Sequence, residues 1–214
     1  MKKHKGILIT LEGNEGCGKS TQIKLLHEYL KNQGRRVFLT REPGGTAVSD
    51  GIRAVLLDNK NKKMTAVTET LLYMASRAQL VEEVIKPRLQ RGEIVLCDRW
   101  LDATLAYQGY GGGVDKRWIE ELGKAATQGI RPALTLFLTL PLAIGLKRAI
   151  SHKKADRMES KGLGYHKKVR RGYLAIATKE PRRFRLLPVG DNDTVLSVHE
   201  KIKEMIQNVL SKNK

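Results

Sequence analysis

The sequence predicts an α/β protein built on one parallel sheet of five strands with helices on both faces. Short apolar runs of strand length alternate along the chain with longer segments whose apolar residues recur at helical spacing. Length and composition agree with this, because 214 residues, 41% of them hydrophobic, can bury one substantial core. No repeat or linker interrupts the alternation, so we expect residues 1–214 to form a single domain.

The first half of the chain supplies three helical segments and two strands. Residues 7–11 are expected to form the first strand and residues 20–33 the first helix, which Gly34 ends as a C-cap glycine would. Residues 36–40 follow as the second strand. A short amphipathic helix is expected over 50–57, and a long helix over 66–90 with a kink or break at Pro87.

The second half continues the alternation. Residues 93–97 are expected to form the third strand, and a helix over 101–108 then leads into a flexible glycine-rich turn over 109–113. Asp115 is placed to cap a helix that runs to Gln128. The remaining expectations are a strand at 134–138, a helix that begins at Pro141, a basic helix that ends at Lys179, a strand at 185–189 and a closing helix at 195–210.

A glycine-rich motif lies between the first strand and the first helix. It has the spacing G-x-x-x-x-G-K-[ST] and consists of Gly13, Asn14, Glu15, Gly16, Cys17, Gly18, Lys19, Ser20 and Thr21. The glycines let successive N–H groups curl around an anion, Lys19 adds a full charge, and Ser20 offers a hydroxyl to Mg²⁺. The pattern predicts a polyphosphate site in a three-layer P-loop NTPase fold. A glycine-rich turn with a solvated lysine is the alternative.

Two more candidate sites follow strand ends, the edge at which ligands bind in open parallel sheets. Arg41 follows the second strand and precedes a Pro-Gly-Gly turn, where it could hold an anion with its guanidinium fork or pair with a nearby carboxylate. Asp98 follows the third strand and is expected to be the second Mg²⁺ partner, through water, with Arg99 beside it gripping a second phosphate. A plain Asp98–Arg99 ion pair that caps the next helix is the alternative.

Tyr73 and Arg77 lie four residues apart and therefore share a helix face. An aromatic ring beside a forked donor can stack on a nucleotide base and hydrogen-bond to it. Spacing alone favours a core tyrosine and a surface arginine.

The chain is strongly basic, with a formal net charge of +18. Between Lys147 and Arg185, fourteen Lys and Arg face three acids, so +11 of the +18 lies there. This segment could be a solvated face, a groove for a polyanion or a lid over nucleotide phosphates. The apolar run near the N-terminus is too short for a signal sequence or a membrane span, and the two cysteines lack metal-ligand spacing. We therefore expect a cytoplasmic protein without a membrane segment.

In this order and spacing, the motifs resemble those of the thymidylate kinase (dTMP kinase) family over nearly the whole chain. They are residues 13–21, Arg41-Glu42-Pro43-Gly44-Gly45-Thr46, Tyr73 with Arg77, Asp98-Arg99-Trp100 and Thr104-Leu105-Ala106-Tyr107-Gln108-Gly109. The resemblance implies Mg²⁺-assisted phosphorylation of dTMP by ATP to give dTDP for dTTP synthesis. Because the attacking phosphate oxygen is already anionic, the reaction needs charge screening and alignment rather than a general base.

The resemblance also implies roles for individual residues. Residues 13–21 would bind ATP, with Lys19 on the β- and γ-phosphates, and Ser20 and Asp98 would hold Mg²⁺. The dTMP site would consist of Arg41 and Arg99 at the phosphate, Glu15 at the 3′-hydroxyl, Tyr73 stacked on thymine, Arg77 on the base, Thr104 or Gln108 at its edge and Tyr107 crowding the 2′ position.

Family members with glycine at the position of Gly16 resemble a class whose lid supplies the catalytic arginines. The lid is expected at about residues 149–164, with hinge-like freedom at Gly162 and Gly164. Arg148 and Arg157 are retained and would be catalytic together with Lys19 and Arg99. The positions between them read Ile150, His152, Lys153 and Lys154, where more arginine is expected, and lysine lacks the guanidinium fork.

The family also implies a homodimer with ATP and dTMP as ligands and no nucleic-acid partner. Two alternatives stay open at this point. One is another nucleoside monophosphate kinase, and the other is a basic P-loop ATPase that uses the Lys147–Arg185 segment as a nucleic-acid groove.

Overall fold

The computed structural model describes residues 6–142, 144–145, 148, 156–190 and 192–211. The expectations for Ile150, His152, Lys153 and Lys154, and for the lid between residues 149 and 155, lie outside this part of the chain.

Five parallel strands form one sheet in the order β2-β3-β1-β4-β5. They are β1 (Ile7–Gly13), β2 (Val37–Arg41), β3 (Ile94–Asp98), β4 (Leu134–Thr139) and β5 (Phe184–Pro188). The predicted strands are confirmed to within one or two residues at each end. In the register, Asp98 of β3 pairs with Arg41 of β2 on one side and with Leu11 of β1 on the other. The ends of the three strands that carry the predicted motifs therefore meet at one edge of the sheet.

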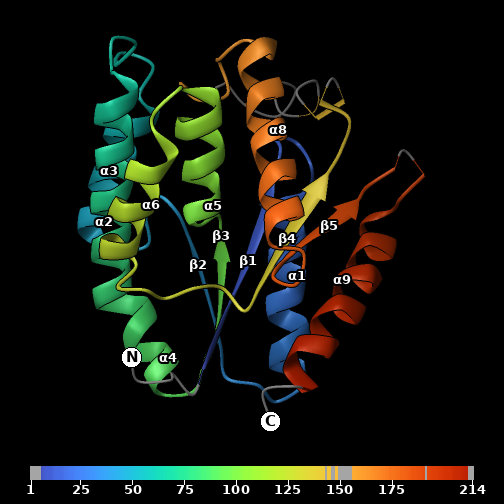
Figure 1. Cartoon of the computed structure of the whole chain (residues 1–214). Coiled ribbons are helices and arrows are strands. Elements are labelled where there is room, and N and C mark those ends of the chain that lie inside the picture. Colours follow the sequence, from blue (N-terminus) through green and yellow to red (C-terminus); the bar gives the residue numbers. More distant parts are fainter. Residues whose placement is uncertain (1–5, 143, 146–147, 149–155, 191, 212–214) are drawn as a thin grey trace.

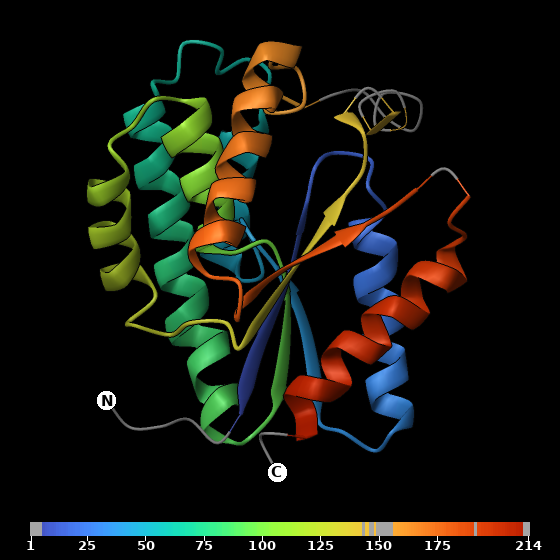
Figure 2. The same ribbon diagram turned by 45° about the vertical axis from the view of Figure 1, so that its right-hand side comes forward.

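Helices cover both faces of this sheet (Figures 1 and 2). Their bounds are α1 (Lys19–Asn32), α2 (Ala47–Leu57), α3 (Ala66–Leu80), α4 (Lys86–Gln90), α5 (Leu101–Thr104), α6 (Lys116–Ala126), α8 (Leu163–Lys179) and α9 (Val195–Leu210), with π-helical segments η1 (Val81–Ile85) and η2 (Leu105–Gly111). None of the helices that the structure describes is long and apolar enough to cross a membrane.

Alternating side chains along each strand fill two separate layers of core. Ile9 of β1 and Leu96 of β3 pack with Ile23 of α1 and Ile202 of α9. On the opposite face, Leu8 of β1 packs with the η1 and α4 residues that follow α3. A third cluster joins β4 to η2 and α8. The central strand β1 is therefore buried on both faces, as the three-layer prediction requires.

Two local predictions about glycines are wrong. The expected flexible turn over residues 109–113 is helical as far as Gly111, because η2 packs closely against α8. A Cβ on Gly111 would lie 2.7 Å from the ring of Tyr165, and a Cβ on Gly172 would lie 2.8 Å from Tyr110. Gly164, expected to be a hinge, lies inside the first turn of α8, while Gly162 is its N-cap.

Two predictions of helix ends depend on side-chain caps. The helix expected from residue 50 begins at Ala47, because the Thr46 hydroxyl accepts the Ser49 N–H and caps it three residues earlier. Asp115 caps α6 through the N–H groups of Arg117 and Trp118, as predicted.

A partly buried ion pair anchors α5 to the chain entering β5. Arg183 donates from Nη1 and Nη2 to the two carboxylate oxygens of Asp102, at 2.7 and 2.8 Å. Thr135 of β4 joins the pair through its hydroxyl. This bidentate contact holds α5 in place directly after the Asp98-Arg99-Trp100 motif.

Candidate active site

A cleft of about 1080 Å³ lies at the carboxyl edge of the sheet, above the ends of β1, β2 and β3. Most of the predicted site residues line it. They are Glu15, Gly16, Cys17, Gly18, Lys19, Ser20, Thr21, Arg41, Tyr73, Arg77, Asp98, Arg99, Thr104, Tyr107, Gln108 and Arg148. The predicted residues Gly13, Asn14 and Arg157 do not line it. The fold thus brings together segments that are up to 144 residues apart, from Glu15 to Glu159.

The phosphate loop has the backbone that its spacing predicts. Gly16 and Gly18 both have positive φ, +70° and +84°, and a Cβ on Gly16 would lie 2.1 Å from the carbonyl oxygen of Gly145. Gly18 is the N-cap of α1, without a side-chain cap, so the first N–H groups of α1 face the loop. Gly13 and Asn14 are buried behind it and shape it, since a Cβ on Gly13 would lie 2.4 Å from the Cys17 sulfur.

Asp98 joins the loop to β3. Lys19 Nζ lies 3.4 Å from Asp98 Oδ1, and the Ser20 hydroxyl donates to Asp98 Oδ2 at 3.1 Å. A hydroxyl and a carboxylate side by side are oxygen ligands of the kind that Mg²⁺ prefers when phosphates and water complete its shell. Among the described residues, no group of three or more His, Cys, Asp and Glu could form a metal cage. The donors present therefore fit an ion that arrives with the phosphates.

Arg99 has a left-handed backbone, with φ of +73°, which is strained for a residue with a side chain. Two hydrogen bonds hold this conformation, from Arg99 N to Leu11 O and from Trp100 N to Glu12 Oε1 at 2.8 Å. The guanidinium donates to Glu15 Oε1 at 2.7 Å. Arg99 therefore pairs with Glu15 rather than Asp98, and the alternative of a plain Asp98–Arg99 ion pair is wrong.

Glu12 is a site residue that the sequence interpretation missed. Its side chain is fully buried and accepts the Tyr173 hydroxyl at Oε2, 2.8 Å away, besides the Trp100 N–H. Burial raises the pKa of Glu12 to about 8, even though Arg99 acts to lower it. The only local signal was a carboxylate at the end of an otherwise apolar strand.

Glu15 has the opposite electrostatics, although it lies three residues away. Burial acts to raise the pKa of Glu15, but the charges of Arg99 and Lys19 outweigh it and the pKa is lowered. The Tyr107 hydroxyl also donates to Glu15 Oε1 at 2.8 Å. Glu15 is thus an ionised carboxylate held between two cations and a phenol at the wall of the cleft.

One face of α3 lines part of the cleft. Arg77 is only 2% exposed, so the surface position that spacing favoured is wrong. Its burial is possible because Nε and Nη2 donate to Glu42 Oε2 at 2.8 and 2.6 Å, and Nη2 also donates to Thr104 at 3.0 Å. Tyr73 lies one turn earlier, half-buried, and lines the cleft. Glu42 is a second carboxylate whose role the sequence interpretation missed.

A third buried carboxylate, Glu69, lies two turns before Arg77 on the same face. Gln108 Nε2 donates to its Oε1 at 2.7 Å, and Arg157 Nη1 lies 2.6 Å from its Oε2. Arg157 also donates from Nε to the Leu56 carbonyl oxygen. The structure therefore places Arg157 in a buried ion pair behind the cleft and not at its surface.

The arginines nearest the open side of the cleft differ in their contacts. Arg41 is exposed, and its Nη2 lies 3.5 Å from Asp50 Oδ1, so the predicted carboxylate contact exists but is long. Arg53, which the sequence interpretation missed, also lines the cleft and donates to the Pro43 carbonyl oxygen at 2.8 Å. Arg148 is exposed.

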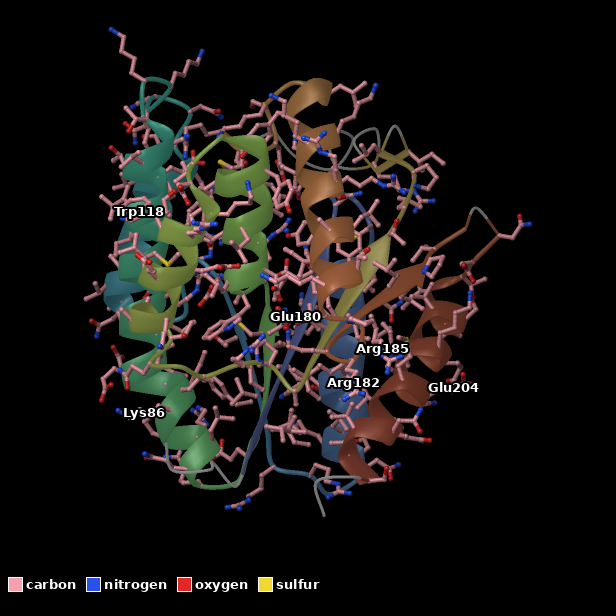
Figure 3. The ribbon with its side chains drawn as sticks, viewed as in Figure 1. Lys86, Trp118, Glu180, Arg182, Arg185 and Glu204 are labelled. Carbon is pink, nitrogen blue, oxygen red and sulfur yellow. The ribbon has the colours of Figure 1, made fainter. Side chains whose placement is uncertain are left out.

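Part of the basic charge of the Lys147–Arg185 segment lies away from the cleft. Figure 3 shows Arg182 and Arg185 near the start of β5, in the lower half of the view, whereas the strands reach the cleft at the upper edge. Both side chains are exposed, as are Lys167 and Lys168 on α8. These four side chains therefore belong to a solvated face, one of the three alternatives given for the basic segment.

Comparison with known proteins gives consistent results. A family model described as "Thymidylate kinase" matches residues 11–202. The thymidylate kinase of Citrifermentans bemidjiense is 49% identical over 213 residues, which cover 95% of this chain and 94% of that protein. The thymidylate kinase of Geotalea uraniireducens is 51% identical over 185 residues, covering 84% and 87%. The crystal structure of thymidylate kinase from Ehrlichia chaffeensis is similar with a TM-score of 0.78 and 32% identity, and the match covers 94% of this chain and 98% of that one.

Proposed function

The chain belongs to the thymidylate kinase family and is a nucleoside monophosphate kinase, and from this premise we propose that it transfers the γ-phosphoryl group of ATP to dTMP. A bond forms between a dTMP phosphate oxygen and the γ-phosphorus, the bond from that phosphorus to the β–γ bridging oxygen breaks, and ADP and dTDP leave. The observation that carries the proposal is the single cleft in which the phosphate loop and the Arg77 pocket face one space.

ATP is proposed to bind at the phosphate loop, residues 13–21. The N–H groups at the start of α1 and the ammonium group of Lys19 would hold its β- and γ-phosphates. Mg²⁺, held by Ser20 and Asp98, would neutralise charge on these phosphates when it is bound. Lys19 is already positioned by its 3.4 Å contact with Asp98, so little ordering is needed when the nucleotide enters.

The dTMP phosphate is proposed to lie between Arg99 and Arg41. Arg99 is held in place by the hydrogen bonds of its own and the next backbone N–H and by its contact with Glu15, whereas the exposed Arg41 can turn from Asp50 to the phosphate. Together, the two cations would offset the repulsion between the acceptor and donor phosphates. Arg148 is proposed to add charge from the lid side. Arg157 is proposed to act at a distance, by tethering the lid to Glu69.

The nucleoside is proposed to lie along α3 and η2. Tyr73 would stack on thymine, Arg77 and Gln108 would hydrogen-bond to its edge together with Thr104, and Glu15 would accept the 3′-hydroxyl. The Tyr107 ring, fixed by its hydrogen bond to Glu15, would leave no room for a 2′-hydroxyl. The position of each side chain in the cleft and the family resemblance support these proposed roles.

A homodimer and a cytoplasmic location belong to the same proposal. Support for the dimer comes from apolar side chains exposed on α2 and α3, where Val48, Val55, Val67 and Leu71 are each 46–55% exposed. Sedimentation equilibrium tests this, since a dimer has twice the 24.0 kDa mass of the chain and a monomer mass at micromolar concentration would reject it.

Turnover of dTMP, dUMP, UMP, CMP, AMP and GMP, measured side by side with ATP and Mg²⁺, tests the reaction. We expect ADP formation that depends on dTMP and exceeds that with UMP, CMP, AMP and GMP. A higher kcat/KM for another monophosphate would favour that kinase instead. ATP hydrolysis that requires added DNA and no monophosphate would overturn the proposal in favour of the nucleic-acid ATPase, which the comparisons do not favour.

A further inference from the structure

We propose that Glu69 determines which pyrimidine the enzyme accepts, by fixing the orientation of the Gln108 side-chain amide. This inference rests on the proposed function, in which Gln108 meets the edge of the base. Glu69 itself does not line the cleft and would not touch the nucleotide, so it is a positioning residue.

The hydrogen bond between the two side chains is buried and short. Gln108 Nε2 donates to Glu69 Oε1 at 2.7 Å, and both residues are 1% exposed. A side-chain amide has one donor end and one acceptor end, and an ionised carboxylate can only accept. The amide nitrogen must therefore face Glu69. The oxygen, Oε1, is left for the cleft, which Gln108 lines, and it receives no hydrogen bond from any residue in the described ranges.

Two cations keep Glu69 in the role of acceptor. Arg157 Nη1 lies 2.6 Å from Oε2, and Lys161 Nζ lies 3.2 Å from both carboxylate oxygens. Arg157 is 7% exposed and is itself held by the Leu56 carbonyl oxygen, so this arrangement has little freedom to rotate. Both cations, Arg157 and Lys161, come from the last part of the expected lid, residues 149–164, and they tie Glu69 to that segment.

Arg77 supplies the complementary group two turns along α3. Glu42 and Thr104 take the hydrogens of Nε and Nη2, and Met74 contacts Nη1, which leaves one Nη1 hydrogen for a ligand. Guanidinium has no acceptor atom. The structure thus presents a carbonyl oxygen at Gln108 and an N–H group at Arg77, each side chain held by a buried carboxylate.

This pattern matches thymine and opposes cytosine. Thymine carries an N3–H donor beside the O4 acceptor, whereas cytosine carries an N3 acceptor beside a 4-amino donor. Gln108 Oε1 would accept the thymine N3–H, and Arg77 would donate to O4. With cytosine, the Gln108 oxygen would face the N3 acceptor and the Arg77 N–H would face the 4-amino donor, so neither hydrogen bond could form. Buried polar groups that are left unpaired in this way discriminate strongly between ligands.

Glu69→Gln is expected to reverse the Gln108 amide. Arg157 and Lys161 would attract the oxygen of the new side-chain amide, so the nitrogen of that amide would face Gln108. The Gln108 oxygen would then turn away from the cleft, toward residue 69, to accept from that nitrogen. An N–H group would then point into the cleft. We expect the ratio of kcat/KM for dTMP to that for dCMP to fall at least about tenfold, which corresponds to one exchanged hydrogen bond. The KM for ATP should stay within about twofold, because its site is elsewhere in the cleft.

Asp102→Asn is the matched control, because it also neutralises a buried carboxylate held by an arginine, Arg183, but lies outside the cleft. It should lose stability as Glu69→Gln does while keeping the dTMP to dCMP ratio. An unchanged ratio in Glu69→Gln would overturn the proposal. If that variant does not fold, Gln108→Leu is measured instead, and an unchanged ratio there would overturn it equally. Wild-type enzyme without dTMP turnover would refute the proposed function and with it the premise of this inference, whereas wild-type dTMP turnover with an unchanged ratio in the variant would refute the inference alone.

Discussion

Replacing Glu12 with glutamine should make the free energy of unfolding less dependent on pH between pH 6 and pH 8. Burial raises the pKa of Glu12 from 4.5 to about 8 in the folded protein, so the folded chain keeps this proton over a range in which the unfolded chain releases it. The stability from this group is therefore complete below about pH 4.5. It declines as pH rises, until the folded carboxyl ionises as well near pH 8.

The size of the effect follows from the two pKa values. Linkage between 4.5 unfolded and about 8 folded gives a loss of about 2 kcal/mol in the free energy of unfolding from pH 6 to pH 8. Glutamine does not titrate and escapes this loss, while its carbonyl oxygen can still accept the Trp100 N–H. The free energy of unfolding of Glu12→Gln minus that of wild type should therefore increase by about 2 kcal/mol from pH 6 to pH 8.

Urea denaturation at pH 6, 7 and 8, with variant and wild type in parallel, measures the difference directly. Glu15→Gln is the control, since the pKa of Glu15 is lowered and this carboxyl is ionised in both states over that range. The difference between Glu15→Gln and wild type in the free energy of unfolding should not change with pH over this range. A Glu12→Gln difference that stays constant to within about 0.5 kcal/mol would refute the reasoning, because the folded carboxyl would then already be ionised at pH 6.

Two further predictions concern the cleft. Lys19→Ala should abolish turnover and leave the far-ultraviolet circular dichroism spectrum unchanged. The ammonium group that is lost faces the proposed phosphates and Asp98 rather than the core. Near-normal turnover of the variant would contradict the proposed role of Lys19. Arg77→Ala should raise the KM for dTMP much more than the KM for ATP, and it should cost about 3–5 kcal/mol of stability, because Glu42 is left buried without its partner. Equal increases in both KM values would argue against a contact between Arg77 and the base.

Local pattern accounts for most of what could be predicted. Strands and helices have their own periodicities, and the glycine loop has its own spacing, so the five strands and the phosphate loop were identifiable before any tertiary contact was known. Arg41 and Asp98 could be assigned to one edge of the sheet, because each follows a strand of a parallel sheet. The observed register places them opposite each other.

Errors arose where packing between distant segments overrode local preference. The glycines after residue 108 looked like a flexible turn, but the chain is helical as far as Gly111, where α8 packs so closely that a Cβ would meet the Tyr165 ring. Arg77 looked like a surface residue at its helical spacing. Burying it requires a carboxylate, and Glu42, 35 residues away, supplies one.

The sequence by itself therefore determined the sheet, the phosphate loop, the cations that follow the strands and the resemblance to the family. Only the tertiary structure decided how the arginines are used. It placed Glu12 against the Trp100 N–H, Glu42 against Arg77 and Glu69 against Arg157. The physical reason is that spacing along the chain reports which face a side chain occupies. Which carboxylate meets which cation depends on strand order and on how helices pack across the sheet.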